Sequence, residues 1–257
     1  MNYNIELLDL VSELAPIQQQ LKFFKKDDNT IALLAQQMDK KIVYCLEAPA
    51  SDFEFPGEAV RFFDYKKFKS FFDIFNISGK EEEFNDTPIL DVNLTDAGEV
   101  YDIIIKSSKG KQQFTYRTAC EGAIDTPTFK GIDFQNTSAG FTMSEAQVNH
   151  LQKMINLIQD KTERSGIKFH ATGDILTVSF ICLATSNSYK IEYKLDNPVT
   201  EEFTFSTDKE GICLLPSTEY TVNIDSRGLI RFHMNREDEI KLDLYISKQK
   251  VISAGRV

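Results

Sequence analysis

The stretch DYKKFKSFFDIF, residues 64 to 75, carries the pattern that organises the whole chain. Its phenylalanines recur at positions i, i+3, i+4 and i+7, which predicts an amphipathic helix with one buried face. Lys66 and Lys69 are expected to project away from that face. The phenylalanines are Phe68, Phe71, Phe72 and Phe75.

The same spacing occurs in SEAQVNHLQKMINLIQDK, residues 144 to 161, where Lys153 lies opposite the apolar stripe. A third helix is predicted near the N-terminus, and Pro16 is expected to end it because its ring clashes with the preceding turn. A fourth, shorter helix is predicted after Thr207. The apolar stripe of residues 144–161 consists of Leu151, Met154, Ile155 and Ile158, and that of the N-terminal helix consists of Leu7, Leu10, Val11 and Leu14.

Polar residues at the helix starts support these predictions. Residues 144–147 (SEAQ) and 207–210 (TDKE) both have the sequence of a capping box, in which two side chains satisfy free backbone amides reciprocally. Asp64 is expected to accept amides at the start of its own helix.

Between the helices the chain alternates apolar and polar residues with period two, which predicts half-buried antiparallel strands. Examples are KFH (168–170), ILTVSF (175–180), YKIEY (189–193) and LIRFHM (229–234). The recurrence of helices among such strands predicts an α+β chain of two duplicated domains, with helices on one face of antiparallel sheets.

The composition of the chain further narrows the classes of protein to which it can belong. Of the 257 residues, 42% are hydrophobic and 20 are Phe, which is ample for a core in each half, whereas no apolar run reaches the roughly 18 residues that span a bilayer. No N-terminal signal is apparent, and four single cysteines, expected to be small buried hydrophobes, suit a reducing cytoplasm. The cysteines are Cys45, Cys120, Cys182 and Cys213.

No catalytic motif is present. The sequence lacks a P-loop, a dinucleotide fingerprint, a nucleophile elbow and paired metal-ligand spacing. His150, His170 and His233 lie in separate predicted elements and do not form a cluster. We therefore expect a binding or structural protein rather than an enzyme, with no cofactor and no metal.

The net charge of −10 argues against simple adhesion to nucleic acid, but basic residues gather on the helices. Such a distribution would repel DNA from most of the surface and tolerate it along one side. The alternative is that these are ordinary solvated helix faces. The basic residues expected to face DNA are Lys66, Lys67, Lys69, Lys153, Lys161, Arg164 and Lys209.

The order of elements, given twice, resembles the processivity clamps of DNA polymerases, most closely those of tailed bacteriophages. The similarity covers nearly the whole chain and rests on element order and apolar pattern. It departs from the clamp pattern in the first helix, whose polar side offers Glu6, Asp9 and Glu13 but no lysine. The similarity is carried by FFDY (62–65), FTMS (141–144), FTF (203–205), LP (215–216) and SRG (226–228), together with the strands and helices between them.

The resemblance implies a first clamp domain at residues 1–119, a connector at 120–140, a second domain at 141–247 and a tail at 248–257. It further implies a homotrimeric ring that encircles double-stranded DNA topologically, without sequence specificity. The ring would tether a DNA polymerase, and a clamp loader would place it on DNA, in the cytoplasm of an infected bacterial host and away from membranes.

Two further sites follow from the resemblance. The subunit joint is expected where an edge strand at 112–117 meets an edge strand at 188–194 of the next subunit, although the same side chains could simply pack within their own sheets. A pocket for a partner's hydrophobic tail is expected beside the connector, although the connector's apolar residues could instead pin it to its own domain. The joint residues are Phe114, Tyr116, Tyr189, Ile191 and Tyr193, and the pocket residues are Met38, Ile132, Phe134, Leu229 and Leu244.

Two other functions fit the same pattern. One is a clamp-fold co-activator of phage late transcription, and the other is a ring-forming structural protein of the phage tail.

Overall fold

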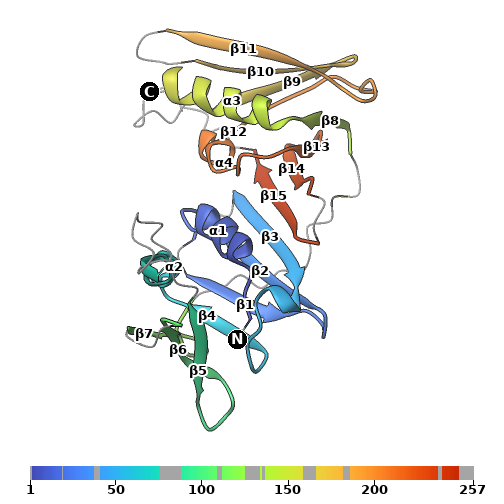
Figure 1. Ribbon diagram of the computed structural model, residues 1–257. Coiled ribbons are helices and arrows are strands. Elements are labelled where there is room, and N and C mark those ends of the chain that lie inside the picture. The colour runs from blue at the N-terminus through green and yellow to red at the C-terminus, as the bar shows by residue number, and fades with distance from the viewer. Residues whose placement is uncertain are drawn as a thin grey trace, which may run out of the picture. The chain divides into compact units, whose positions relative to one another are not determined.

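The computed structural model describes residues 2–18, 20–37, 41–75, 88–108, 112–124, 134, 137–158, 166–181, 186–236 and 239–248 (Figure 1). The chain divides into two compact units. The first contains residues 1–36, 45–129 and 238–241, and the second contains residues 37–44, 130–237 and 242–257. The strands β3 and β15 are each divided between the two.

The elements follow one another in the order that the sequence predicts. From the N-terminus to Arg117 they are α1 (Ile5–Leu14), β1 (Leu21–Lys25), β2 (Thr30–Gln36), β3 (Ile42–Pro49), the 3-10 helix η1 (Ala50–Asp52), β4 (Ala59–Phe62), α2 (Tyr65–Phe75), β5 (Ile89–Leu94), β6 (Val100–Lys106) and β7 (Gln113–Arg117).

The remaining elements are β8 (Ala139–Met143), α3 (Glu145–Ile158), β9 (Ile167–Thr172), β10 (Ile175–Ile181), β11 (Ser188–Lys194), β12 (Phe203–Thr207), α4 (Lys209–Cys213), β13 (Tyr220–Asp225), β14 (Leu229–Met234) and β15 (Lys241–Ser247).

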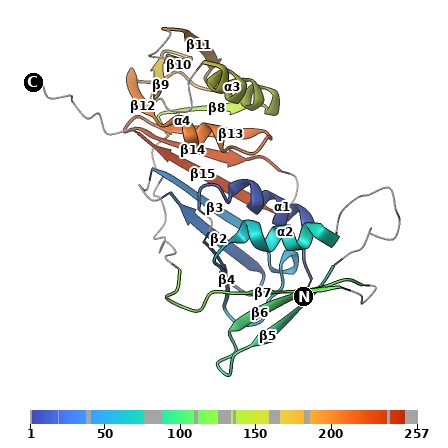
Figure 2. The ribbon, with the colours of Figure 1, turned by 90° about the vertical axis from the view of Figure 1, so that its left-hand side faces the viewer.

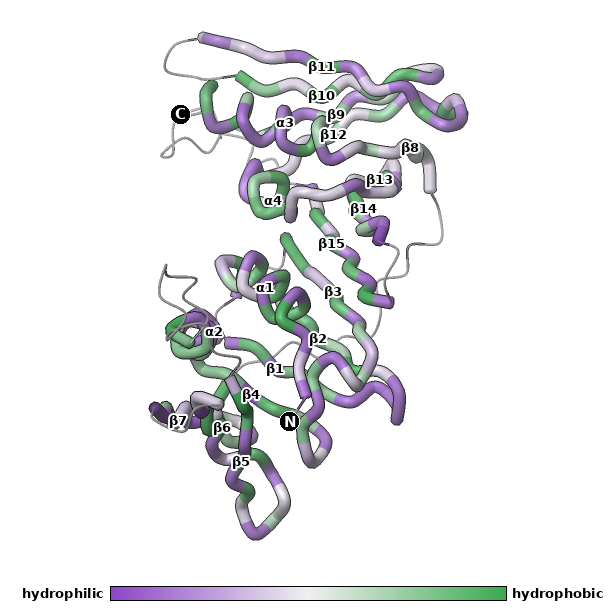
Figure 3. The backbone as a smooth tube through the Cα atoms, viewed as in Figure 1, coloured by the Kyte–Doolittle hydropathy of each residue, from purple (hydrophilic) through white to green (hydrophobic). Residues whose placement is uncertain are grey.

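Each unit contains antiparallel ladders and two helices. In the first unit β1 pairs with β2 and β4, and a separate sheet has the order β5-β6-β7. In the second unit β13 pairs with β8 and β14, β14 pairs with β15, and a separate sheet has the order β11-β10-β9-β12. Hydrophilic and hydrophobic residues alternate along these strands (Figure 3). The predicted class of duplicated antiparallel domains with few helices is confirmed.

The helix starts agree with the sequence at two of the predicted sites. The Asp64 carboxylate accepts the Lys67 amide at 3.0 Å. In the capping box before α3, the Ser144 amide donates to Gln147 Oε1 at 2.8 Å and the Gln147 amide donates to Ser144 Oγ at 3.4 Å. The first helix ends at Leu14, two residues before Pro16.

The predicted capping box at residues 207–210 is wrong. Asp208, not Thr207, is the N-cap of α4, and its side chain makes no capping hydrogen bond. Its carboxylate instead accepts from the Lys41 ammonium at 2.7 Å, because a charged partner binds it more strongly than a helix amide. The Thr207 hydroxyl is buried with no hydrogen-bond partner among the described residues.

The first unit is built around aromatic side chains. Figure 2 shows α1 and α2 side by side, and the Tyr65 hydroxyl of α2 donates to the Leu8 carbonyl of α1 at 3.0 Å. The Phe68 ring lies 4.8 Å from Phe62 and 5.5 Å from Tyr116, measured between ring centroids. Such tilted and edge-to-face contacts stabilise the core beyond the burial of apolar area.

The predicted turn at residues 226–228 also forms. The Asp225 carboxylate accepts the Arg227 amide at 2.8 Å and pairs with its guanidinium, and these hydrogen bonds hold the pKa of Asp225 below its usual range. Gly228 has φ of +96° and lies against the Lys248 side chain. A side chain at this position would be strained and would collide with that lysine.

No described helix is long and apolar enough to cross a membrane. Cys45 and Cys213 are only half-buried and Cys120 is exposed, so the expected burial is partial for the first two and wrong for Cys120. Cys182 lies outside the described residues.

Two buried tyrosines differ in whether their hydroxyl is satisfied. Tyr44 is fully buried with no hydrogen-bond partner among the described residues, and burial raises the pKa of Tyr44 well above its ordinary value. Tyr65 is equally buried but donates to Leu8.

We expect Tyr44→Phe to raise the free energy of unfolding by about 1 kcal/mol, because it removes an unsatisfied buried hydroxyl. The matched change Tyr65→Phe should lower it by about 1 kcal/mol, because it leaves a carbonyl unpaired. Urea unfolding followed by circular dichroism measures both. Equal destabilisation by the two changes would contradict the conclusion that the Tyr44 hydroxyl is unsatisfied and the Tyr65 hydroxyl is satisfied.

Candidate functional site

Two of the predicted lysines of α2 are available at the surface. Lys66 and Lys67 are exposed, while Phe68 and Phe72 on the opposite side of the helix are buried. This is the orientation that the stripe predicts. Both residues lie in the first turn of the helix.

Lys69 does not project into solvent, so that part of the prediction is wrong. Its side chain is only 6% exposed, and its ammonium lies 2.6 Å from an Asp9 carboxylate oxygen of α1 and also binds Asp73. Burial would lower the pKa of Lys69, but the hydrogen bonds from Asp73 and Asp9 outweigh it and raise the pKa above its ordinary value.

The acidic side of α1 therefore has a structural partner. Asp9 supplies one of the two carboxylates that enclose Lys69, whereas Glu6 and Glu13 remain exposed. One lysine and two aspartates leave this cluster with a negative formal charge. Its contribution to any attraction for phosphate is consequently small.

Two of the remaining predicted basic residues lie on described helices of the second unit. Lys153 is exposed on α3, and Lys209 is half-buried in the first turn of α4. Lys161 and Arg164 lie outside the described residues. Lys66 and Lys67 in one unit and Lys153 in the other are thus the predicted positions at which an exposed ammonium is described.

The predicted edge strand β7 does lie at the edge of its sheet, since among the described strands it pairs only with β6. Phe114 is half-buried and stacks on Phe71 of α2 with centroids 5.3 Å apart. Tyr116 is buried, and its hydroxyl both donates to the Asp64 carbonyl and accepts the Asp64 amide at 3.1 Å. Tyr116 thus belongs to the core of its own unit and only Phe114 reaches the surface.

The second predicted edge strand, β11, pairs with β10 and with no other described strand. Tyr189 and Ile191 are half-buried, and the Tyr189 hydroxyl lies 2.7 Å from His150 Nε2 of α3. Tyr193 is buried with its ring 5.0 Å from Phe141, so it too is a core residue. Because these residues are spaced by two, alternation places them on one face of each strand, and burial along that face is complete only at Tyr116 and Tyr193.

Two exposed apolar residues on α2 and α3 escaped the sequence analysis. Ile74 of α2 is 41% exposed and follows Phe71 by three residues, so it shares the face that meets β7. Leu157 of α3 is 70% exposed and follows His150 by seven residues, so it shares the face that meets Tyr189. The sequence did contain a sign of their exposure, because Ile74 and Leu157 are apolar residues that lie outside the main apolar stripe of their amphipathic helices.

Only part of the predicted partner pocket can be placed. Phe134 is half-buried with its ring 6.4 Å from Tyr245, and Leu229 is half-buried at the start of β14. Leu244 is completely buried, so it is a core residue and the prediction that it lines a pocket is wrong. Met38 and Ile132 lie outside the described residues.

Two hollows among the described residues have mixed linings. One, of about 570 Å³ in the first unit, combines Phe53 and Phe55 with charges of both signs that include Lys25 and Glu54. An open hollow at the start of α3 is lined by Ser144, Glu145 and neighbouring polar residues. No group of three or more potential metal ligands occurs among the described residues.

We expect Lys69→Gln to lower the free energy of unfolding by about 2 kcal/mol, because it leaves two carboxylates without their charged partner. Lys66→Gln, three residues earlier on the exposed side, should change it by less than about 0.5 kcal/mol. Urea unfolding compares the variants.

The effect of Lys69 should also depend on pH. Because its folded pKa is raised, its stabilisation is complete below the ordinary pKa of about 10.5 and is lost as pH rises through the folded value. The difference in stability between wild type and Lys69→Gln should therefore shrink above about pH 10.5. A difference that stays constant to higher pH would show that the lysine acts through packing alone.

No protein-family model matches the sequence, and no curated protein is similar to it in sequence. Solved structures do match the fold. Proliferating cell nuclear antigen (PCNA) from Thermococcus kodakaraensis aligns with a TM-score of 0.67 and 14% identity, covering 95% of this chain and 96% of that one. PCNA from Entamoeba histolytica aligns with a TM-score of 0.68 and 14% identity, covering 95% of each chain.

These alignments span nearly the full length of all three chains at an identity too low to carry residue roles. They agree with the element order that the sequence predicts and with the repeated antiparallel ladders described above. The chain has the fold of the PCNA sliding clamps.

Proposed function

We propose that the protein is a DNA sliding clamp, a ring that encircles duplex DNA and tethers a replicative DNA polymerase. The proposal rests mainly on two edge strands. Among the described strands, β7 in the first unit and β11 in the second each pair on one side only. The fold that contains them is shared with PCNA over 95% of the chain. Such a protein has no chemical step. It acts by raising the effective concentration of the polymerase at the DNA.

The two edges are suited to each other. Among the described strands each pairs on one side only, and each carries a half-buried aromatic or aliphatic side chain, Phe114 on β7 and Ile191 on β11. Each also borders an exposed apolar helix residue, Ile74 or Leu157, which strand addition would cover. We infer that β7 of one subunit joins β11 of the next in a homotrimer of the tailed-bacteriophage type.

The charge of the described helices supports loose contact with DNA. Lys66, Lys67 and Lys153 are exposed, whereas Lys69 is neutralised by two aspartates. Contacts from a few lysines to phosphate carry no sequence information and are equivalent at each step along the duplex. A ring can therefore remain on DNA by topology while it slides.

Further partners follow from the same proposal. A closed ring needs a clamp loader, and a polymerase tail would dock beside the connector, where Phe134 and Leu229 are half-buried apolar residues. The site of action would be the cytoplasm of an infected bacterial host.

The mass in solution tests the ring. Light scattering coupled to size exclusion should give a species of three times the chain mass of 29.3 kDa, with dissociation at low concentration. Ile191→Lys on the open edge should weaken assembly roughly tenfold or more, because it replaces an apolar contact of about 1.5–3 kcal/mol. Ile175→Lys is the control, since Ile175 is 39% exposed on the neighbouring strand β10, which is paired on both sides. Equal effects of the two changes, or a monomer at every concentration, would overturn the proposed joint.

Retention on DNA tests the topological hold. The protein is mixed at high concentration with duplex DNA and then diluted. It should stay bound to a duplex that is blocked at both ends, whereas a duplex with one free end should release it. Replacing Lys66, Lys67 and Lys153 by Glu should reduce retention severalfold and leave the mass unchanged, because these side chains are exposed. Equal retention on blocked and free duplexes would contradict encirclement.

A further inference from the structure

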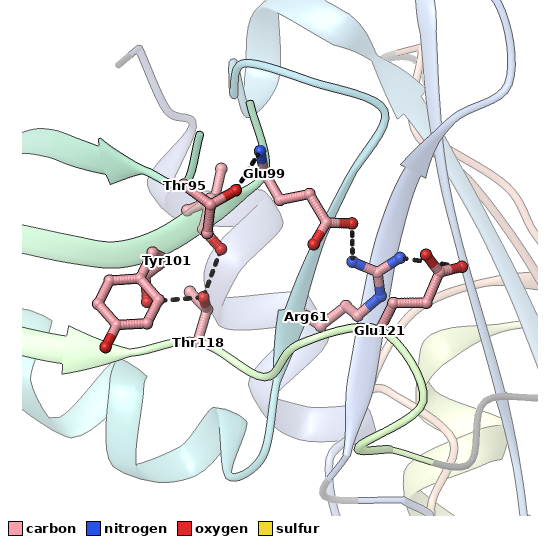
Figure 4. A network of polar contacts seen from close by, with 7 residues as sticks. Arg61, Thr95, Glu99, Tyr101, Thr118 and Glu121 are labelled. Carbon is pink, nitrogen blue, oxygen red and sulfur yellow. Dashed lines mark hydrogen bonds and ion pairs between the residues drawn. The ribbon is translucent and has the colours of Figure 1, made fainter. Parts of the chain in front are cut away.

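Arg61 of β4 is a buried charge that the proposed joint does not use directly. Its side chain is 10% exposed, yet the guanidinium reaches two carboxylates from different parts of the first unit. Nη1 lies 3.5 Å from Glu99 Oε1, in the turn before β6, and Nη2 lies 3.8 Å from Glu121 Oε1, just beyond β7 (Figure 4). The planar guanidinium can hold both at once, whereas an ammonium is a single point charge.

The backbone around Arg61 is tied to the same segment. The Arg61 carbonyl accepts the Ala119 amide at 3.0 Å. The Thr118 amide donates to the Tyr101 carbonyl at 3.1 Å, and its hydroxyl donates to the Val100 carbonyl at 2.6 Å and to the Tyr101 carbonyl at 2.9 Å. Figure 4 shows Thr118 bonded to Tyr101, and Arg61 between Glu99 and Glu121. Residues 118–121 are therefore attached to both β4 and β6.

Stability alone does not explain a charge at this position. A buried ion pair is commonly no more stabilising than a well-packed apolar residue of similar volume, because desolvation offsets the attraction. Glu121 is also 78% exposed, so its pair with Arg61 is worth little to the whole protein. The opening of a local turn is more sensitive to such a pair, because an interaction of about 1 kcal/mol changes the ratio of closed to open forms of the turn about fivefold.

We propose that Arg61 is a positioning residue that fixes the end of β7, and thereby the geometry with which this open edge meets a second copy of the chain. The proposal rests on the function proposed above for the joint. Arg61 touches neither the partner strand nor DNA in this account. It acts by preventing residues 118–121 from peeling away from β4 and β6, which would shorten the regular edge.

Two variants test it from opposite sides of the ion pair. Arg61→Met removes the charge and keeps most of the volume, and Glu121→Gln removes only the exposed partner. Glu58→Gln is the matched control, because it makes the same charge change on an exposed side chain of the same unit. Hydrogen exchange of the Thr118 and Ala119 amides reports the turn, urea unfolding reports the fold, and sedimentation equilibrium reports self-association.

In both test variants we expect exchange at Thr118 and Ala119 to be about fivefold faster, with an unchanged urea midpoint. Self-association should weaken by a similar factor, and Arg61→Lys should restore only part of it because it cannot span both carboxylates. The control should match wild type in all three measurements.

Unchanged exchange in both test variants would overturn the proposal, as would faster exchange with unchanged self-association. A loss of association that tracks a lowered urea midpoint, without selective exchange at residues 118–119, would assign Arg61 to the fold and also overturn it. A wild-type chain that stays monomeric would refute the proposed joint instead, and faster local exchange in the variants would then still support the fixing of β7.

Discussion

The packing of the phenylalanine face of α2 against its sheets is the constraint on which the first unit depends. Phe68 contacts Phe62 of β4 and Tyr116 of β7, so one helix residue links two sheets. Phe71 stacks on Phe114, which lies two residues before Tyr116 on the same strand. Because the helix and the edge strand share these contacts, the surface of β7 is set by the core beneath it.

That arrangement gives α2 two sides with different surroundings. The buried side of α2 orients β7, and the exposed side presents Lys66 and Lys67 to solvent. Lys69 lies between these two sides and is enclosed by Asp9 and Asp73, which join α2 to α1 and to its own next turn. The cationic surface is smaller than a count of lysines suggests, which favours loose contact over tight adhesion.

The sequence predicted much of this because the determining signals are local. Period-two alternation located β11, and the spacing of Phe68 and Phe72 oriented α2. Where the prediction failed, the deciding partner was distant in the chain. Lys69 is buried by an aspartate sixty residues earlier, and the carboxylate of Asp208 is taken by Lys41 rather than by its own helix. Such pairings leave no mark on local periodicity.

The proposed joint uses an edge of one kind in the first unit and of another kind in the second, which would make self-association directional. Every added copy would bury one β7 and one β11 and leave one of each at the ends of the growing assembly. Only the rotation between successive copies decides whether those ends meet or continue as a screw. A substitution far from either strand could therefore convert a closed particle into a filament without altering a single contact at the seam.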